Sequence, residues 1–203
     1  MTKISYSGIA SRPSSSRPFW LYAGAKLGIL GGRVAAGGAT LVQLGDKEGD
    51  TRRLVKDARA IKTALAVSLV PLLINDRVDV ALASGADGVH VGSDNMAPAD
   101  ARALLGREAI IGLSIKTIAQ AEAAPVELVG YVCIGGVFAT ASKGNPDPPI
   151  GLAALRAIWA LMRARRGSPS APSSALTLAR DPSAAAREQR AIVDRAVTMR
   201  VDP

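Results

Sequence analysis

The sequence of 203 residues is poor in the side chains that build several common kinds of site. A single cysteine, Cys133, excludes an intramolecular disulfide and a cysteine-built metal site. The chain has only one histidine, His90, in addition to that cysteine, so it also lacks the ligand set of a zinc centre. Aromatic residues make up only 3% of the chain, too few for the stacking platforms that bind single-stranded nucleic acid.

Long apolar runs are also missing. No run approaches the roughly 20 consecutive apolar residues that a membrane helix requires. The first residues do not combine a charged start with an apolar core, which is the pattern of a secretory signal. We therefore expect a cytoplasmic protein that does not bind membranes.

The net charge of +8 belongs to the two ends of the chain. Residues 1–35 contribute +5 and contain no acidic residue, and residues 151–203 contribute another +5 from nine arginines and four acids. The middle, residues 36–150, has eleven basic and thirteen acidic residues and a net charge of −2. Since the positive charge is not concentrated on the folded middle, nucleic acid is not an expected partner.

Forty-eight per cent of the residues are apolar, enough for one sizeable core. Residues 1–17 are rich in Ser, Arg and Pro and predict a disordered leader. Residues 18–200 predict a single domain, with a Ser/Pro linker at 167–173. Short apolar runs in this domain predict strands near residues 19–24, 40–44, 69–74, 88–92, 109–114 and 128–136.

Segments with helical spacing lie between these runs. Residues 50–65 place Leu54, Ala58, Ile61 and Leu65 near one face, and residues 97–106 end at a glycine. Short buried strands that alternate with helices indicate a parallel sheet covered by helices. At least five such units in so short a stretch favour a (β/α)8 TIM barrel, and an open doubly wound sheet is the alternative.

Polar residues follow the predicted strands, where the active site of a (β/α) barrel lies. Each has a local explanation as well, because Asp76 can cap a helix near Val78, Ser114 can start the next helix, and Lys143 can be a solvated loop charge. His90 is more typical of a hydrogen-bonded core residue than of a catalytic one. The polar strand ends are Gln43, Asp46 and Lys47, then Asn75, Asp76 and Arg77, then Asp94 and Asn95, then Ser114 and Lys116, then Thr140, Ser142 and Lys143.

Together these residue types predict a site for a polyanion and a divalent cation. Carboxylates from two strand ends can hold Mg²⁺ when a substrate oxygen or water completes the oxygen shell, which suits a diphosphate. Lysines supply point charges to the same oxygens. The run GGVFATASKGN combines glycines, two hydroxyls and a lysine, a composition suited to a phosphate-binding nest but not to a P-loop.

The segments GGATLVQLGDK, PLLINDRVDVALASGADGVHVG, IIGLS and GGVFATASK, in this order, resemble the thiamine-phosphate synthase family over roughly residues 37–158. The resemblance implies a TIM barrel that joins hydroxymethylpyrimidine pyrophosphate to thiazole phosphate and releases pyrophosphate. In that family the pyrophosphate leaves first and the thiazole nitrogen captures the resulting cation, so the implied site neutralises a leaving group. The related thiazole tautomerases share the barrel and several of these loops.

The resemblance also implies roles for individual residues. Ser114 and Lys143 are the expected catalytic residues, and Asp76, Asp94 and Asn95 fall on the Mg²⁺ positions. Ser174 falls beside the thiazole phosphate. The remaining expected substrate contacts are Gln43, Lys47, Asn75, Thr140 and Ser142.

Several positions depart from the family pattern. Gly45 replaces an arginine that would bind phosphate in a bidentate manner, and Asn95 replaces a carboxylate. The first βα unit is short, and the linker at 167–173 stands where the family has a seventh strand and its helix. The sequence therefore predicts an incomplete barrel with impaired activity and possible self-association, and leaves a non-catalytic relative as the alternative. Lys116 stands where a tautomerase has its general-base histidine, which counts against that function.

Overall fold

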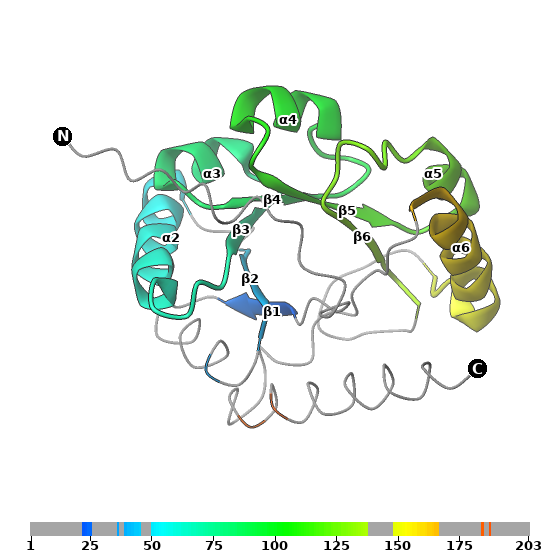
Figure 1. Ribbon diagram of the computed structural model, residues 1–203, viewed down its shortest axis with the longest axis horizontal. Helices are drawn as coiled ribbons and strands as arrows, with labels where there is room; N and C mark the ends of the chain where they lie inside the picture. The colour runs from blue at the N-terminus through cyan, green and yellow to red at the C-terminus, as the bar shows by residue number, and fades with distance from the viewer. Residues whose placement is uncertain are drawn as a thin grey trace.

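The computed structural model describes residues 22–25, 36, 39–45, 50–137, 148–166, 184 and 187. In this part of the chain, six strands form one parallel sheet whose spatial order follows the chain order. Figure 1 shows that the sheet curves strongly, so that its strands line a half-barrel. The strands are β1 (Tyr22–Ala25), β2 (Leu41–Leu44), β3 (Leu72–Asn75), β4 (Gly88–Val91), β5 (Ile110–Ile115) and β6 (Tyr131–Ile134).

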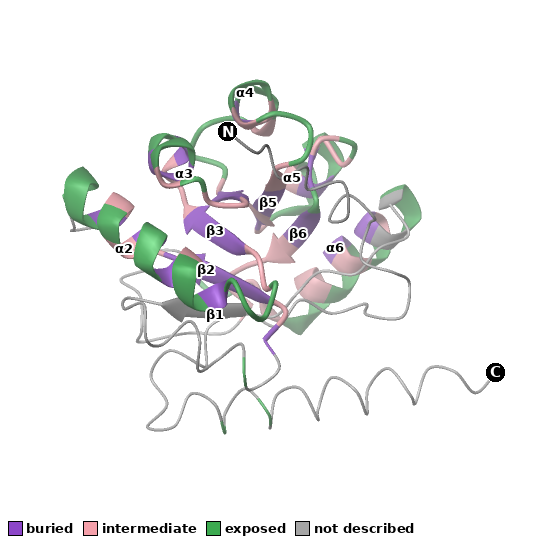
Figure 2. Cartoon of the chain, turned by 60° about the vertical axis from the view of Figure 1, so that its left-hand side comes forward, coloured by how far each residue is buried: buried purple, intermediate pink, exposed green. Residues whose placement is uncertain are grey.

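Five helices cover the convex side of the sheet (Figure 1): α2 (Thr51–Leu65), α3 (Val78–Ser84), α4 (Pro98–Leu105), α5 (Ile118–Ala123) and α6 (Gly151–Arg166). Asp50 caps the first of them, because its side chain accepts a hydrogen bond from the Arg53 N–H at 2.8 Å. The buried stripe of α2 is Leu54, Ala58, Ile61 and Leu65, as its spacing predicts. Figure 2 shows the same pattern in the other helices, with buried residues toward the sheet and exposed residues outside.

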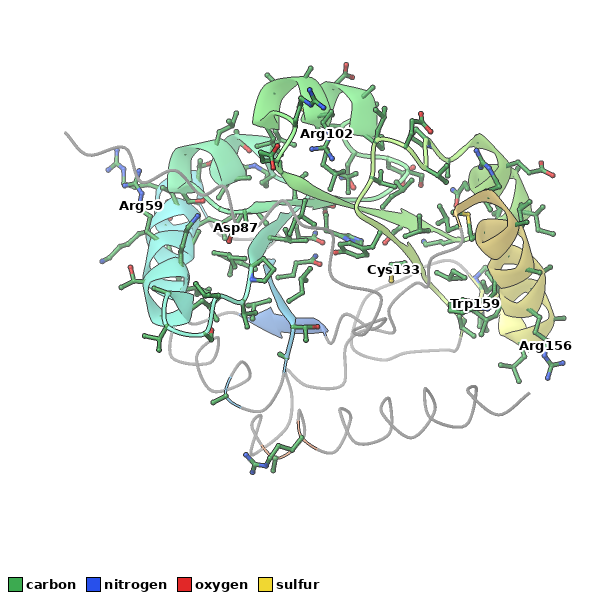
Figure 3. All side chains as sticks on the ribbon, viewed as in Figure 1. Arg59, Asp87, Arg102, Cys133, Arg156 and Trp159 are labelled. Atoms are coloured by element: carbon green, nitrogen blue, oxygen red, sulfur yellow. The ribbon has the colours of Figure 1, made fainter. Side chains whose placement is uncertain are left out.

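The concave face of the sheet has its own small core. Successive side chains of a strand point to opposite faces, so every second residue of each strand faces inward. Leu41, Leu73 and Tyr131 pack together there, with Ile110 and Cys133 against them. In Figure 3 the Cys133 side chain lies on this inner side of the sheet.

The predicted α/β architecture, a parallel sheet covered by helices, is confirmed. The doubly wound alternative is wrong, because the six described strands follow one another without a reversal of order and the helices described with them lie on one face. Strand β3 begins at Leu72, later than predicted, since Leu69 has a φ of 53° and Pro71 has no N–H to donate. Strand β1 pairs with β2, so a first strand is present.

The leader at 1–17 and the linker at 167–173 lie outside the described residues and stay predictions. Among the helices that the structure describes, none is long and apolar enough to cross a membrane.

Candidate active site

Polar side chains gather on the concave face at the carboxyl ends of the strands. The pairing register places Asn75 beside His90, His90 beside Gly112, and Ser114 beside Cys133. Cross-strand partners in a sheet point to the same face, so these side chains share the inner face. Their sequence neighbours Ile74, Val89, Val91, Leu113 and Ile115 are buried in the helix-facing core. The structure thus brings two of the predicted strand ends, those of Asn75 and Ser114, to one mouth of the half-barrel.

Gln43, Asn75 and Asp76 form a hydrogen-bonded chain of fixed polarity. Asn75 Nδ2 donates to Asp76 Oδ2 at 2.6 Å, and Gln43 Nε2 donates to Asn75 Oδ1. An ionised carboxylate only accepts, so it fixes the orientation of the Asn75 amide, which in turn fixes that of Gln43. The sequence predicted these residues as ligands, and the structure shows that they also orient one another.

This polarity leaves the side-chain oxygen of Gln43 as an acceptor at the end of the three hydrogen-bonded residues. The Gln43 side chain is 2% exposed, and within the described part of the protein its Oε1 is buried without a hydrogen-bond partner. A buried carbonyl oxygen without a donor costs about 1–3 kcal/mol. Gln43 Oε1 is therefore suited to accept a hydrogen bond from a ligand that carries an N–H group.

Strand β3 ends in a strained turn at Asp76. The φ of Asp76 is 62°, a left-handed conformation that is uncommon for a residue other than glycine. Two backbone bonds hold it, from the Asp76 N–H to the His90 carbonyl at 2.8 Å and from the Arg77 N–H to the Asn75 carbonyl at 2.7 Å. The Asp76 carboxylate is thereby held at the strand end.

The side chain of Arg77 makes its hydrogen bonds outside the site. Its guanidinium donates to both oxygens of Asp79, at 2.8 and 2.6 Å, and to Thr51 Oγ1 at 2.7 Å. The hydrogen bond from Arg77 lowers the pKa of the Asp79 carboxyl below its ordinary value. The predicted cap of α3 by Asp76 is wrong, because the N-cap position is Arg77 and no side chain caps this helix. Asp76 is therefore not the N-cap of α3.

His90 links three strands by side-chain hydrogen bonds. Its Nδ1 lies 2.8 Å from Tyr131 Oη, and its Nε2 lies 2.8 Å from Ser114 Oγ. The predicted hydrogen-bonded core role of His90 is thus observed, but one of its partners is an expected catalytic residue. Ser114 does not start α5, since Thr117 and Gln120 form the capping box of that helix. Ser114 therefore keeps its side chain on the inner face.

The turn after β4 holds two of the predicted metal ligands. Asn95 Oδ1 accepts from the Gly92 N–H at 2.7 Å, so this amide closes the turn. Asp94 is exposed and accepts from the Ser93 hydroxyl at 3.2 Å. Within the described residues there is no group of three or more His, Cys, Asp or Glu that could hold a metal ion by itself. A divalent cation here would need oxygen atoms from a substrate or from water.

Gly45 lies directly beside Asn75, the middle one of the three hydrogen-bonded residues. A Cβ at this position would lie 3.2 Å from Asn75 Cβ, a close but adjustable contact. Half-buried Lys116 follows Ser114 by two residues at the end of β5. The predicted ligands Lys47, Thr140, Ser142, Lys143 and Ser174 lie outside the described residues, so their roles stay predictions.

Sequence reasoning missed Tyr131 and Gly112 as members of this site. Tyr131 is separated from His90 by 41 residues and reaches it through the pairing of three strands. The only signal was local: each residue lies in a predicted strand, two positions before another inward-facing residue. Only the register of the strands reveals that they meet.

Comparisons with known proteins agree with this geometry. A family model described as thiamine monophosphate synthase matches residues 27–173. A thiamine-phosphate synthase of Agrobacterium fabrum is 54% identical over 129 residues, which cover 64% of this chain and 59% of that protein. Another, from Solidesulfovibrio magneticus, is 43% identical over 181 residues, covering 80% of this chain and 86% of the relative.

A solved structure supports the fold that the described residues show. The thiamine phosphate pyrophosphorylase of Pyrococcus furiosus superposes with a TM-score of 0.72 at 26% identity, covering 88% of this chain and 97% of that one. Several curated relatives are matched over less than two thirds of their own length, between 54% and 59% for the proteins from Agrobacterium fabrum and Xanthobacter autotrophicus. Matched over most of its length by the family model, the chain belongs to the thiamine monophosphate synthase family.

Proposed function

We propose that this chain is a thiamine-phosphate synthase, a cytoplasmic transferase that condenses hydroxymethylpyrimidine pyrophosphate with thiazole phosphate to give thiamine monophosphate and pyrophosphate. The relatives named for this activity support the proposal. The observation that carries it is the row of hydrogen bonds that joins Asp76, Asn75 and Gln43. This row ends in the buried acceptor Gln43 Oε1 at the mouth of the half-barrel. The Asp76 carboxylate at one end of this row suits a cation and a diphosphate, and Gln43 Oε1 at the other end suits a donor on a pyrimidine.

The proposed roles of Gln43, Asn75 and Asp76 follow from the direction of the hydrogen bonds between them. The amino group of the pyrimidine donates to Gln43 Oε1, which satisfies the buried acceptor. Asn75 holds Gln43 in this orientation and is itself held by Asp76. A site that binds a substrate N–H in this way rejects an analogue without it strongly, because the acceptor is then left unpaired.

The donor set at this edge fits Mg²⁺. Asp76 and Asp94 would hold the ion, because Mg²⁺ is commonly bound through one or two carboxylates plus substrate phosphate and water. When bound, Mg²⁺ neutralises the charge that develops on the leaving diphosphate. Lys47 and Lys143 add positive charge to the same oxygens, and Thr140 and Ser142 add hydroxyl donors. Ser174 is the proposed contact of the thiazole phosphate.

Purified full-length chain, given both substrates and Mg²⁺, should release thiamine monophosphate and pyrophosphate. Asp76→Asn should lower kcat on the order of 10²- to 10³-fold, because it removes a carboxylate that would hold the Mg²⁺ that neutralises the leaving group. Asp79→Asn is the matched control. It removes a carboxylate three residues away that binds Arg77 and does not face the site, so kcat should stay near the native value.

A second candidate is a relative that binds pyrophosphate compounds without turnover. Gly45 favours it, because glycine lacks the guanidinium that an arginine at this position would bring close to Asn75. Asn95 also favours it, because an amide that closes its own turn replaces a carboxylate. Binding of the pyrimidine substrate without product in the same assay would establish this candidate and overturn the synthase proposal.

A further inference from the structure

His90 occupies a central and largely buried position at the mouth of the half-barrel. Its side chain is 8% exposed and lies between two hydroxyl groups, with Tyr131 Oη and Ser114 Oγ each 2.8 Å from a ring nitrogen. The three residues come from β4, β5 and β6, which pair in register. The imidazole ring is therefore held between the side chains of Tyr131 and Ser114.

Gly112 provides the space in which the ring and the phenol meet. It lies between His90 and Tyr131 in the pairing register. A Cβ at this position would lie 2.4 Å from His90 Nδ1 and 2.5 Å from Tyr131 Oη, closer than real contacts allow. Any side chain on β5 at this point would separate the two groups, so the contact depends on glycine.

The chemistry of the three groups indicates the direction of the protons. A neutral imidazole has one nitrogen that donates and one that accepts. A phenol is a stronger hydrogen-bond donor than an alcohol because it is the more acidic hydroxyl. Tyr131 O–H therefore donates to Nδ1, which leaves the proton of the ring on Nε2. The Nε2–H in turn donates to Ser114 Oγ.

We propose that His90 and Tyr131 are positioning residues that present Ser114 as a hydrogen-bond donor toward an anionic oxygen at the mouth of the half-barrel. When Nε2–H occupies a lone pair of Ser114 Oγ, the hydroxyl hydrogen points away from His90. The opposite tautomer would use that hydrogen on the ring and leave Ser114 an acceptor, which an anion would repel. The inference rests on the proposed function, in which that oxygen belongs to the departing diphosphate.

Nuclear magnetic resonance tests the proton positions without any turnover. His90 is the only histidine of the chain, so the ¹⁵N-labelled full-length protein gives a single, unambiguous imidazole signal set. We expect Nε2 to be protonated at neutral pH and Nδ1 to be unprotonated. A spectrum in which Nε2 has no proton would overturn the proposal, whatever the protein catalyses.

A double-mutant cycle tests whether Tyr131 acts through Ser114. Tyr131→Phe keeps the ring and removes one hydroxyl, and should lower kcat on the order of 10-fold while the KM for the pyrimidine diphosphate changes less. In a Ser114→Ala background the same change should alter kcat less than about 2-fold, since the group being positioned is gone. Equal losses in both backgrounds would overturn the proposal.

Two further results separate the alternatives. Tyr131→Phe removes one hydrogen bond from the buried His90 ring and should lower the unfolding temperature by several degrees, so its activity is measured below the unfolding transition, where a loss does not reflect unfolding. If the native chain makes no thiamine monophosphate, the proposed function fails, and the imidazole spectrum alone decides the positioning role.

Discussion

At the scale of single residues, Asp76 shows how the site is built at a cost to stability. A residue other than glycine in the left-handed region costs on the order of 1–3 kcal/mol. Two backbone hydrogen bonds, from the N–H groups of Asp76 and Arg77, hold this conformation. In return the carboxylate stands at the strand end, 2.6 Å from the Asn75 amide that it orients. The strain is located where the proposed function needs a carboxylate.

Gly45 is the position where a single substitution should increase activity. Gly45→Arg adds a bidentate phosphate donor next to Asn75, and kcat/KM should rise on the order of 10-fold or more. The new Cβ would lie 3.2 Å from Asn75 Cβ, so a shift of a few tenths of an ångström accommodates it. The measurement is steady-state kinetics with the pyrimidine diphosphate as the varied substrate.

Gly45→Ala is the control for this substitution. It introduces the same Cβ contact without the guanidinium, so it should leave kcat/KM unchanged or slightly lower. If arginine gave no more activity than alanine, position 45 would not face the diphosphate.

The polar residues after the strands could be predicted because parallel strands bring their carboxyl ends to one edge. Asn75, Asp76 and Ser114 were found in this way. The direction of each hydrogen bond could not be predicted, because it depends on which side chains meet across the strands. The buried acceptor of Gln43 and the link from Tyr131 to Ser114 are properties of the register. No local pattern in the sequence contains them.

At the scale of elements, hydrophobic spacing predicted the strands and α2 well. Strand boundaries were less exact where the local backbone departs from the pattern, as at Leu69 and Pro71 before β3. Capping was also misread, because Asp76 and Ser114 look like caps in the sequence. The structure begins α3 after Arg77 and caps α5 with Thr117. Competing roles for one polar residue are decided by its three-dimensional neighbours.

The start of α3 should give the protein a dependence of stability on pH. Arg77 lowers the pKa of Asp79 in the folded protein, so the pair stabilises the fold above the ordinary carboxyl pKa, and this contribution is lost as pH falls through the lowered pKa. Asp79→Asn should therefore reduce the free energy of unfolding at pH 7 by about 0.2–1 kcal/mol, the usual range for an exposed pair. The difference should shrink as pH falls below the ordinary carboxyl pKa and through the lowered pKa of Asp79.

Urea unfolding of the two proteins at pH 7 and at low pH measures this difference. A constant gap between them at all pH values would mean that Asp79 acts by packing and not by its charge.

At the scale of the whole molecule, chemistry and stability are assigned to opposite ends of the sheet. The proposed site lies at the carboxyl ends of the strands. At the amino ends, Asp87 accepts from the Leu72 N–H at 2.9 Å and from Lys62 at 3.2 Å. Arg102 lies at the same end, where Figure 3 shows it between α4 and the sheet. A change at this end should alter folding and leave the site intact.

Arg102 provides the sharpest test of this separation. Its guanidinium donates to the carbonyls of Gly106, Arg107 and Ala109 at 2.9, 3.0 and 2.7 Å, and to that of Leu128 at 2.7 Å. It therefore joins the end of α4 to the segments that lead into β5 and β6. Partial burial lowers the pKa of Arg102, but the group stays charged and its donors remain available.

Arg102→Ala should lower the free energy of unfolding by about 2–4 kcal/mol, because several partly buried carbonyls lose their donor together. Arg102→Lys should recover little, since one ammonium cannot span carbonyls that a planar guanidinium reaches from both of its terminal nitrogens. Arg107→Ala, an exposed neighbour, should change stability by less than about 0.5 kcal/mol. Urea unfolding measures all three variants, and kcat per folded molecule should be native in each. A fall in kcat at full folding would show that the two ends of the sheet are coupled and that the separation is wrong.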